Sequence, residues 1–485
     1  MGYLGIRRPP EWGVDPTPEK VRVLRTFDLF VFWTSLAVGL LVFVAGTLLI
    51  LVAGLTLWEA MGAAIIGSIV GAAVLAGAGV FGSKFGVPTM VSLRPILGTK
   101  GSWMPSVLNI IQLVGWTAFE LYIMGYAATV LSGQFLGEWT MLFWIVFFSL
   151  VVIAFALGGP IVIIRTWLEK IAIWLVIFST IIIAYQIFAH PVSWDSRCIL
   201  DISGARPFAS CTTGGGGGQL LSGIDLVIAM PISWWPLISD YNRFARSRKD
   251  AYVGTILGYT FANFLFFFLG AAMILSTMAG DAITAIGIMG LGSVALFLVM
   301  VDEADNAFAD VYSTALSYQN IRKKAKQSVV IVIATAIALV AAWRISMMAA
   351  GDPLSGGGYE YFLYLIGALF VPLLGIVLAD FWVVRRGNYD IKEFYGGAPN
   401  VRWLAFAAWV PGIVLYYLLT PDLVRLIFPS FEGIGFSIGA SVPSFLLSAI
   451  LYTALRKIPL HASSAHEAPM QEPPHRAQPE LKPPA

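Results

Sequence analysis

The sequence predicts an all-α integral membrane protein with about twelve transmembrane helices, and three observations favour this class. Hydrophobic residue types make up 58% of the 485 residues and charged types only 12%, which is too few charges to coat a water-soluble body of this size. The apolar residues gather in runs of about 20 or more, the length at which a helix crosses the hydrocarbon core. The basic residues then fall almost entirely on one side of those runs, as shown below.

The apolar runs are separated by polar segments. Because backbone groups cannot stay unpaired in lipid, each run should be helical. The expected spans are 28–52, 57–82, 104–132, 139–158, 169–190, 221–241, 252–280, 291–313, 328–350, 359–384, 403–427 and 435–456.

The loop charges test this count independently. If the N-terminus lies in the cytoplasm and the chain alternates sides, only Arg197, Arg206, Arg344 and Arg425 of the 30 Lys and Arg residues fall outside. This asymmetry is the positive-inside rule. We therefore expect a multi-pass protein of the cell (plasma or inner) membrane with both termini cytoplasmic. No basic patch indicates nucleic-acid binding.

The longest external loop, about 191–220, holds both cysteines, Cys198 and Cys211, and the glycine run 214–218. The glycine run lacks the G-K-[ST] ending of a phosphate-binding loop, so we expect a flexible linker. The loop faces an oxidising side, and the cysteines either form a disulfide or stay free. The tail 457–485 has no apolar periodicity and is expected to be disordered.

Span 8 departs most strongly from the apolar pattern. It carries four acids within nine residues, and most of them share one helical face with an asparagine. Intramembrane acids usually face a cavity or a partner, so a cation, a donor-rich solute or water should meet them, and some should hold protons. The alternative is hydrogen bonding between helices, or a helix end close to water. The polar residues are Asp302, Glu303, Asp305, Asn306 and Asp310.

Span 3 places an aromatic ring and an acid together. Trp116 and Glu120 are four residues apart and therefore lie on one face of the helix. A flat indole beside a carboxylate suits a flat heterocycle with N–H donors, because the ring stacks and the carboxylate accepts. Packing alone is the other interpretation of this tryptophan.

Spans 1 and 6 contain helix-weakening residues near their middles. Pro231 and Pro236 interrupt span 6, and Gly39 and Gly46 lie in span 1. Irregular backbone at membrane depth is tolerated where it is buried or lines a cavity. Paired broken helices in corresponding positions of two halves point to the midplane binding site of a transporter.

These motifs and their order resemble the nucleobase–cation symporter-1 family, the purine, cytosine, allantoin and hydantoin permeases, over roughly residues 20–430. The matching pieces are Phe27-Asp28-Leu29-Phe30 with Trp33, Arg94 with Gly98 and Gly101-Ser102, Gly115-Trp116, Ser239-Asp240-Tyr241-Asn242-Arg243-Phe244, Asp305-Asn306 to Tyr312-Ser313, and Pro372 with Asp380 and Arg385-Arg386-Gly387.

The resemblance implies a leucine-transporter-like fold of two inverted five-helix repeats plus two peripheral helices. The expected segments are an N-terminal cytoplasmic part (1–27), the first repeat (28–190), the external loop (191–220), the second repeat (221–384), two peripheral helices (385–456) and the cytoplasmic tail (457–485).

The resemblance also implies a substrate site. In a hydantoin transporter of this family the substrate lies between a tryptophan of span 3 and one of span 6, which here look like Trp116 and Trp234. The position one turn after the first tryptophan is Glu120, and the span-8 position that bonds the ring is Asp310. Asn306 is similar to the family's nearby asparagine, and Ser233 stands where a glycine often lies. The expected substrate-binding residues are Trp116, Glu120, Ser233, Trp234, Asn306 and Asp310.

The cation site departs from the family pattern. The resemblance implies carbonyl ligands at Ala37, Leu40 and Val301, but the two adjacent hydroxyl positions are Ala304 and Asp305 here. A carboxylate suits Na⁺ as a hard oxygen ligand, and it equally suits a proton. The coupling ion therefore stays open between Na⁺ and H⁺, with a slight preference for Na⁺.

We therefore expect a permease, not an enzyme, that imports a nucleobase or related ring by cation symport and works as a monomer without a cofactor. Two carboxylates in the site favour rings with several N–H groups: cytosine, an aminopyrimidine such as hydroxymethylpyrimidine, or a purine. The alternatives are an amino-acid or amine symporter of the same fold, and an intramembrane aspartyl enzyme, for which the sequence has no G-x-G-D motif.

Overall fold

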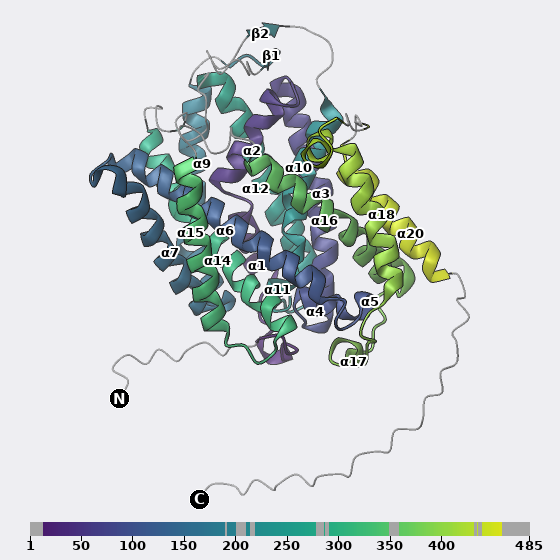
Figure 1. Ribbon diagram of the computed structural model, residues 1–485. Helices are drawn as coiled ribbons and strands as arrows, with labels where there is room; N and C mark the ends of the chain where they lie inside the picture. The colour runs from purple at the N-terminus through teal and green to yellow at the C-terminus, as the bar shows by residue number, and fades with distance from the viewer. Residues whose placement is uncertain are drawn as a thin grey trace, which may run out of the picture.

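The computed structural model describes residues 13–189, 192–199, 210–213, 219–277, 286, 291–348, 358–430, 434 and 439–457. This part of the chain is almost entirely helical (Figure 1). A short hairpin of strands marks one end of the molecule, which we call the hairpin side. The opposite end holds residues 13–25 and the short helices α4, α5 and α17, and we call it the N-side.

Eight helical segments within the described ranges are long and apolar enough to cross a membrane, and a ninth is the bent pair of α1 and α2. The nine are α1 (Thr26–Leu36) with α2 (Leu40–Leu51), α3 (Leu57–Phe85), α6 (Trp103–Ser132), η2 (Gly137–Trp139) with α7 (Thr140–Gly158), α8 (Pro160–Ile163) with η3 (Ile164–Ala172) and α9 (Ile173–Phe188), α10 (Leu220–Ser233) with η4 (Trp235–Leu237) and α11 (Ile238–Asn242), α12 (Arg248–Thr277), α15 (Gln327–Met348), and α16 (Gly358–Leu378) with η5 (Ala379–Val384).

Three further helices occupy the remaining predicted positions. One is a long continuous helix whose apolar sequence is interrupted by the four acids, and the other two have 17 residues each. The prediction of about twelve membrane helices is thereby confirmed. The three helices are α14 (Gly292–Ile321), α18 (Trp403–Leu419) and α20 (Ser441–Lys457), and the remaining short elements are η1 (Glu19–Val21), α4 (Thr89–Ser92), α5 (Arg94–Leu97), β1 (Ser196–Ile199), β2 (Ser210–Thr213), α17 (Ile391–Phe394) and α19 (Pro421–Ile427).

Three predicted span ends differ from those of the structure. The span predicted at 169–190 begins at Pro160, because the π-helical segment η3 carries charged residues that look like a loop in the sequence. The span predicted at 403–427 stops at Leu419, and a separate helix begins at Pro421, which lacks the amide hydrogen needed to continue the first. Span 8 also runs on for two turns beyond its predicted end, to Ile321.

The predicted external loop contains a small antiparallel hairpin rather than irregular chain alone. Strands β1 and β2 pair along their whole length, and their register sets Cys198 opposite Cys211. The backbone pairing therefore brings the two cysteines to facing positions, and the disulfide itself stays a prediction. The glycine run 214–218 and the tail beyond residue 457 lie outside the described residues.

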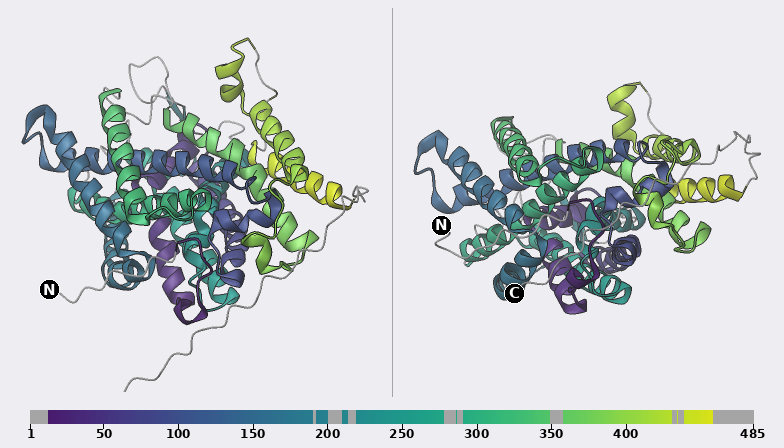
Figure 2. Two further views of the ribbon diagram at one scale, coloured as in Figure 1. Left: turned by 60° about the horizontal axis from the view of Figure 1, so that its bottom comes forward. Right: turned by 90° about the horizontal axis from the view of Figure 1, so that it is seen from below.

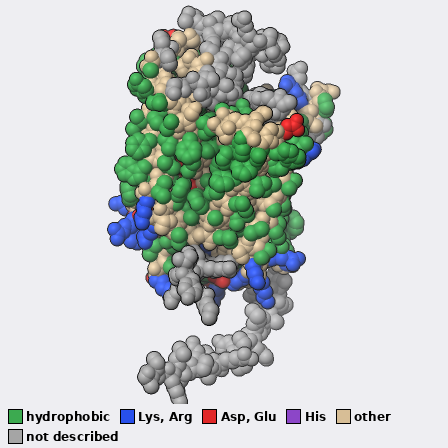
Figure 3. All heavy atoms as spheres, turned by 90° about the vertical axis from the view of Figure 1, so that its left-hand side faces the viewer, with side chains coloured by type: hydrophobic (Ala, Val, Ile, Leu, Met, Phe, Trp, Pro, Cys, Tyr) green, Lys and Arg blue, Asp and Glu red, His purple; other side chains and the backbone are tan. Residues whose placement is uncertain are grey.

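The helices pack in two groups. In the larger group α1 and α2 lie on α12, α3 lies against α10 and α12, and α14 lies along α6. In the smaller group α16, α18 and α20 pack on one another at one flank of the molecule. The opposite flank is formed by α7, which packs on α6, α14 and α15 of the larger group (Figures 1 and 2). On the face that Figure 3 shows, hydrophobic side chains form a broad band, and Lys and Arg side chains lie toward its lower end and at its upper right edge. This surface is the kind that lipid solvates.

The crossing of α2 and α12 depends on glycines at the contact. A Cβ at Gly46 would overlap the carbonyl oxygen of Phe267, and a Cβ at Gly270 would overlap that of Phe43. These obstacles are backbone atoms, so the helices would have to move apart to admit a side chain. Small residues at helix contacts let membrane helices approach closely in this way.

Gly46→Ala is therefore expected to destabilise the fold by about 1–3 kcal/mol, the usual cost of overpacking a close contact. Thermal unfolding of the detergent-solubilised protein measures this effect as a lowered Tm. Gly62→Ala is the matched control, because a Cβ there meets nothing within 4 Å. Equal Tm values for the two variants would contradict the proposed close contact.

Candidate functional site

The broken first span forms one wall of the site. α1 and α2 diverge by 62° around Gly39, whose backbone is extended with a φ of 174°. Side chains of α14 bind the backbone at this break: the amide of Leu40 donates to Glu303 Oε2 at 2.7 Å, and Asn306 Nδ2 donates to the Val38 carbonyl at 3.1 Å. The break is therefore held by hydrogen bonds that replace those of a continuous helix.

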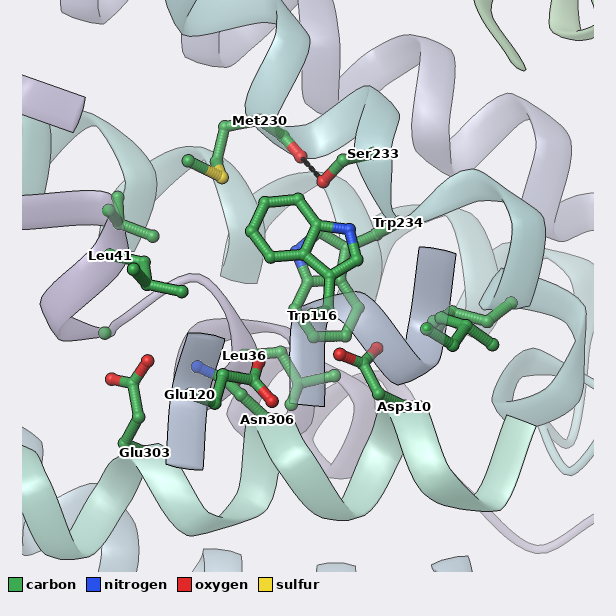
Figure 4. Close-up of a pocket in the computed structure, with 14 residues that line it drawn as sticks. Leu36, Leu41, Trp116, Glu120, Met230, Ser233, Trp234, Glu303, Asn306 and Asp310 are labelled. Carbon is green, nitrogen blue, oxygen red and sulfur yellow. Dashed lines mark hydrogen bonds between the residues drawn. The ribbon is translucent and has the colours of Figure 1, made fainter. Parts of the chain in front are cut away.

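A cavity lies beside this break, between α2, α6, the end of α10 and α14 (Figure 4). About 410 Å³ of space there is not filled by protein atoms, open solvent included. All six residues predicted to bind substrate line it, although they come from three different helical segments, α6, the end of α10 and α14. The lining residues are Leu36, Gly39, Leu41, Val42, Leu113, Trp116, Glu120, Met230, Ser233, Trp234, Leu237, Glu303, Asn306 and Asp310.

Two indole rings wall the cavity, and each is fixed by other aromatic rings. Trp116 meets Phe362 at a centroid distance of 5.2 Å and Tyr359 at 6.0 Å, both edge to face. Trp234 meets Trp33 at 6.4 Å, also edge to face. These aromatic contacts fix the orientation of both indole rings at the cavity wall.

Two carboxylates converge on the same space. Glu120 and Asp310 are 3% exposed, and neither makes a hydrogen bond or ion pair within the described chain. Their carboxylates point toward the space next to the indoles, from α6 and α14 respectively (Figure 4). No Lys or Arg of the described ranges lines the cavity. Buried acceptors without partners are costly, so this arrangement calls for a ligand that supplies N–H donors, protons or a cation.

Ser233 of span 6 is less available than the two acids for binding a solute, because its hydroxyl is already hydrogen-bonded. The hydroxyl of Ser233 donates to the Met230 carbonyl at 2.7 Å, which uses its only hydrogen. Ser233 lines the cavity as predicted, and it can still accept a hydrogen bond from a solute. The binding roles of all six residues stay predictions.

Three of the four residues predicted to bind the cation, Ala37, Leu40 and Asp305, lie at or beside the break of span 1. Ala37 caps α1 and Leu40 begins α2. Asp305 Oδ2 accepts from the Ser35 hydroxyl at 2.6 Å, and its other oxygen is buried without a partner. Val301 lies one turn earlier on α14, and its side chain lines a separate apolar cavity. Binding of an ion by these groups stays a prediction.

A packed polar layer separates the cavity from the N-side. The hydroxyl of Tyr241 donates to the Ala309 carbonyl at 2.7 Å. Arg243 is completely buried, and its guanidinium donates to the Gly13 carbonyl at 2.7 Å and to the Tyr312 hydroxyl at 3.1 Å. This layer closes the cavity on that side.

The N-terminal segment 13–17 completes the closure. The Val14 carbonyl accepts from the Tyr395 hydroxyl at 2.9 Å, and Asp15 pairs with Lys323 at 2.6 Å. The segment therefore ties together parts of the N-side that are hundreds of residues apart in the sequence. The sequence predicted only a polar cytoplasmic N-terminal segment, and its contacts with Tyr395, Lys323 and Arg243 were not predicted.

Sequence reasoning missed several residues that shape the site. Glu303 belongs to the acidic set of span 8, but its bond to the break of span 1 was not predicted. Phe362 of α16 packs against Trp116. A Cβ at Gly115 would lie 2.8 Å from Cζ of Phe362, so the glycine before Trp116 is what allows this close approach, and it is the one sequence feature that could have indicated it. Arg243 lay within a motif that carried the resemblance, without an assigned role.

Residues 16–435 match the model of a family described as permeases for cytosine/purines, uracil, thiamine and allantoin. The chain is 22% identical over 435 residues to the hydantoin permease of Microbacterium maritypicum, with 84% of each chain covered. It is 24% identical over 369 residues to the cytosine permease of Escherichia coli K12, covering 72% of this chain and 80% of that relative.

Among solved structures the fold is similar to that of the nucleobase-cation-symport-1 family transporter Mhp1, in a closed conformation with bromovinylhydantoin bound. The TM-score is 0.70 at 18% identity, covering 92% of this chain and 95% of that one. This likeness confirms the predicted leucine-transporter-like fold of twelve helices. The boundaries 28–190 and 221–384 for the two repeats stay a prediction.

Proposed function

The chain belongs to the family of permeases for cytosine/purines, uracil, thiamine and allantoin, and from this premise we propose that it imports an amino-substituted nucleobase or related pyrimidine. The transport is cation symport by alternating access. Cytosine, hydroxymethylpyrimidine and the purines adenine and guanine are the candidate solutes. The protein is a multi-pass membrane transporter, and the relatives named above are permeases, so the aspartyl-enzyme alternative has no support.

One observation carries the choice of solute. Glu120 and Asp310 line a cavity walled by the indoles of Trp116 and Trp234, and Oε2 of Glu120 is buried there without a hydrogen-bond partner in the described chain. A flat ring fits between aromatic walls, and carboxylates accept hydrogen bonds strongly from N–H groups. A ring with an exocyclic amine and a ring N–H offers donors to both acids at once. An amino-acid or amine substrate would leave the indoles without a flat partner.

The coupling cation is proposed to bind near Asp305, next to the break of span 1. Ala37, Leu40 and Val301 would contribute carbonyl oxygens, and Asp305 a carboxylate. Hard oxygen ligands suit Na⁺, and the buried carboxylate also suits a proton. We favour Na⁺ slightly, and the two ions predict different results in the same assay.

The N-side is proposed to face the cytoplasm of a cell membrane. Lys323 and Arg243 lie on this side, and the loop charges of the whole sequence favour the same orientation. Protease protection of a C-terminal tag in sealed right-side-out vesicles tests the orientation. Cleavage of the tag in intact vesicles would contradict it.

Uptake into proteoliposomes tests the function as a whole. A panel of radiolabelled cytosine, adenine, guanine, hydroxymethylpyrimidine, uracil and allantoin is measured with a Na⁺ gradient and a pH gradient imposed separately. We expect uptake of at least one amino-substituted ring, driven by one of the two gradients. Liposomes without protein give the background. Uptake of none of these solutes under either gradient would refute the proposal.

A further inference from the structure

A second and larger cavity lies on the hairpin side of the site. It contains about 1990 Å³ of unfilled space, including its open mouth, between α2, α10, α16 and the segments around residues 416–421 and 439–441. Met230 and Ser233 line this cavity and the inner one, so the two spaces adjoin. Because the N-side is closed by the layer around Arg243, the larger cavity is the approach to the site in this conformation.

A single acid interrupts the walls of this outer cavity. Among the described residues that line it, Asp225 is the only charged one. Its Oδ2 accepts a hydrogen bond from the Ser441 amide at 3.4 Å and faces the start of α20, where the amides of Ala440 and Val442 and the Ser441 hydroxyl also lie within its reach, while its Oδ1 is buried and has no partner in the described chain. No Lys or Arg of the described chain forms an ion pair with it. The start of α20 therefore satisfies one oxygen of Asp225, and the other, buried among mainly apolar walls, is left to accept a hydrogen bond from an N–H donor or to meet a cation.

The acid is aligned with the inner site along one helix. Asp225, Ala229 and Ser233 are spaced at four residues and share one face of α10, and all three line the outer cavity. Eight residues correspond to about 12 Å along a helix axis. A solute entering from the hairpin side would therefore meet Asp225 about two turns before it reaches Trp234.

The outer cavity repeats the chemistry of the inner one. The inner site combines carboxylates with indole walls, and the outer cavity combines Asp225 with the rings of Phe370 and Tyr416. Apolar and aromatic surface holds a flat ring, and one convergent acid fixes the orientation of its N–H groups. The same class of solute therefore fits both places.

We propose that Asp225 and the outer cavity form a second, weaker binding position for the transported solute, a flat ring with N–H donors, which holds it before it passes to the inner site. This inference rests on the proposed function and extends it. The outer position raises the local concentration of solute at the entrance of the inner cavity. Its loss should therefore act on the concentration dependence of uptake more than on the maximal rate.

Uptake kinetics give the first test. Asp225→Asn keeps an oxygen that can accept from the Ser441 amide, so the contact with α20 is retained. We expect KM for uptake of adenine or cytosine to rise roughly tenfold, the loss typical of one charge-assisted hydrogen bond, with the maximal rate changed less than about twofold. Glu138→Gln is the control, because Glu138 is an exposed acid outside both cavities. Equal KM values for Asp225→Asn and the control would overturn the proposal.

Equilibrium binding separates the two positions. Radiolabelled adenine and cytosine are each titrated onto the purified protein in nanodiscs. Trp116→Ala is expected to remove the tight component and leave a weak one, and adding Asp225→Asn should remove the weak one too. A weak component that survives in the double variant, or none in Trp116→Ala, would overturn the outer position while leaving the proposed function intact. Wild-type protein that transports and binds neither ring would instead overturn both.

Discussion

Asp310→Asn and Glu120→Gln are each expected to reduce the uptake of amino-substituted rings at least tenfold. Each carboxylate is buried, faces the inner cavity and has no partner in the described chain. An amide keeps the shape but loses the charge, and its NH₂ group can oppose the donors of the solute. Loss of a charge-assisted hydrogen bond costs about 1.5–3 kcal/mol, which corresponds to roughly 10- to 150-fold in affinity.

The measurement is the initial rate of adenine and cytosine uptake over a range of concentrations, with wild-type and variant proteins at equal density in proteoliposomes. Asp195→Asn is the matched control, because this acid is exposed on the hairpin side and lines neither cavity. Unchanged kinetics in both site variants would refute the solute class.

The membrane spans and the midplane site were predictable because the background is apolar. Each acid, proline or tryptophan in such a background stands out, and those that line the inner cavity were found from that contrast. The same contrast misled where a helix is itself charged. The segment η3 carries Arg165, Glu169 and Lys170, so its helical backbone could not be recognised from hydrophobicity.

The partners of the site residues could not be predicted, because they depend on contacts between distant segments. Glu303 binds the Leu40 amide, which is 263 residues away in the sequence, and nothing in the local pattern selects it from the four acids. The bracing of Trp116 by Phe362 has the same character. Sequence alone thus identified the residues that face the solute better than those that hold them in place.

The contacts at Gly39 show how closely these parts are coupled. A Cβ at this position would lie 2.9 Å from Glu303 Oε2 and 3.0 Å from Asn306 Nδ2. These two side chains hold the ends of the broken span and also line the solute cavity. A movement of α1 during transport would therefore disturb the cavity directly, which is the coupling that alternating access requires.

Arg243→Ala is expected to open the N-side and to reduce the maximal uptake rate strongly. The buried guanidinium donates to the Gly13 carbonyl and the Tyr312 hydroxyl, and it also contacts the Asp240 carbonyl at 3.3 Å. Without it these acceptors lose their donor and the N-terminal segment loses one of its anchors. Because the bonds to Gly13 and Tyr312 join distant segments across this closed side, their loss is expected to shift the equilibrium toward a state open to the N-side. Each 1.4 kcal/mol lost changes that equilibrium about tenfold.

Labelling of a cysteine placed behind the seal measures this opening. Ser313 is completely buried next to Tyr241, so Ser313→Cys, in a background without Cys198 and Cys211, should react slowly with a maleimide. Adding Arg243→Ala should speed the reaction roughly tenfold or more. Arg243→Lys should give a partial effect, since a single ammonium cannot reproduce the forked guanidinium contacts. Arg246→Ala is the control, because Arg246 is exposed and forms its ion pair with Asp250 near the surface. Equal labelling rates with and without Arg243 would show that the layer does not seal the site, and the closure would then rest on α11 and α14 alone.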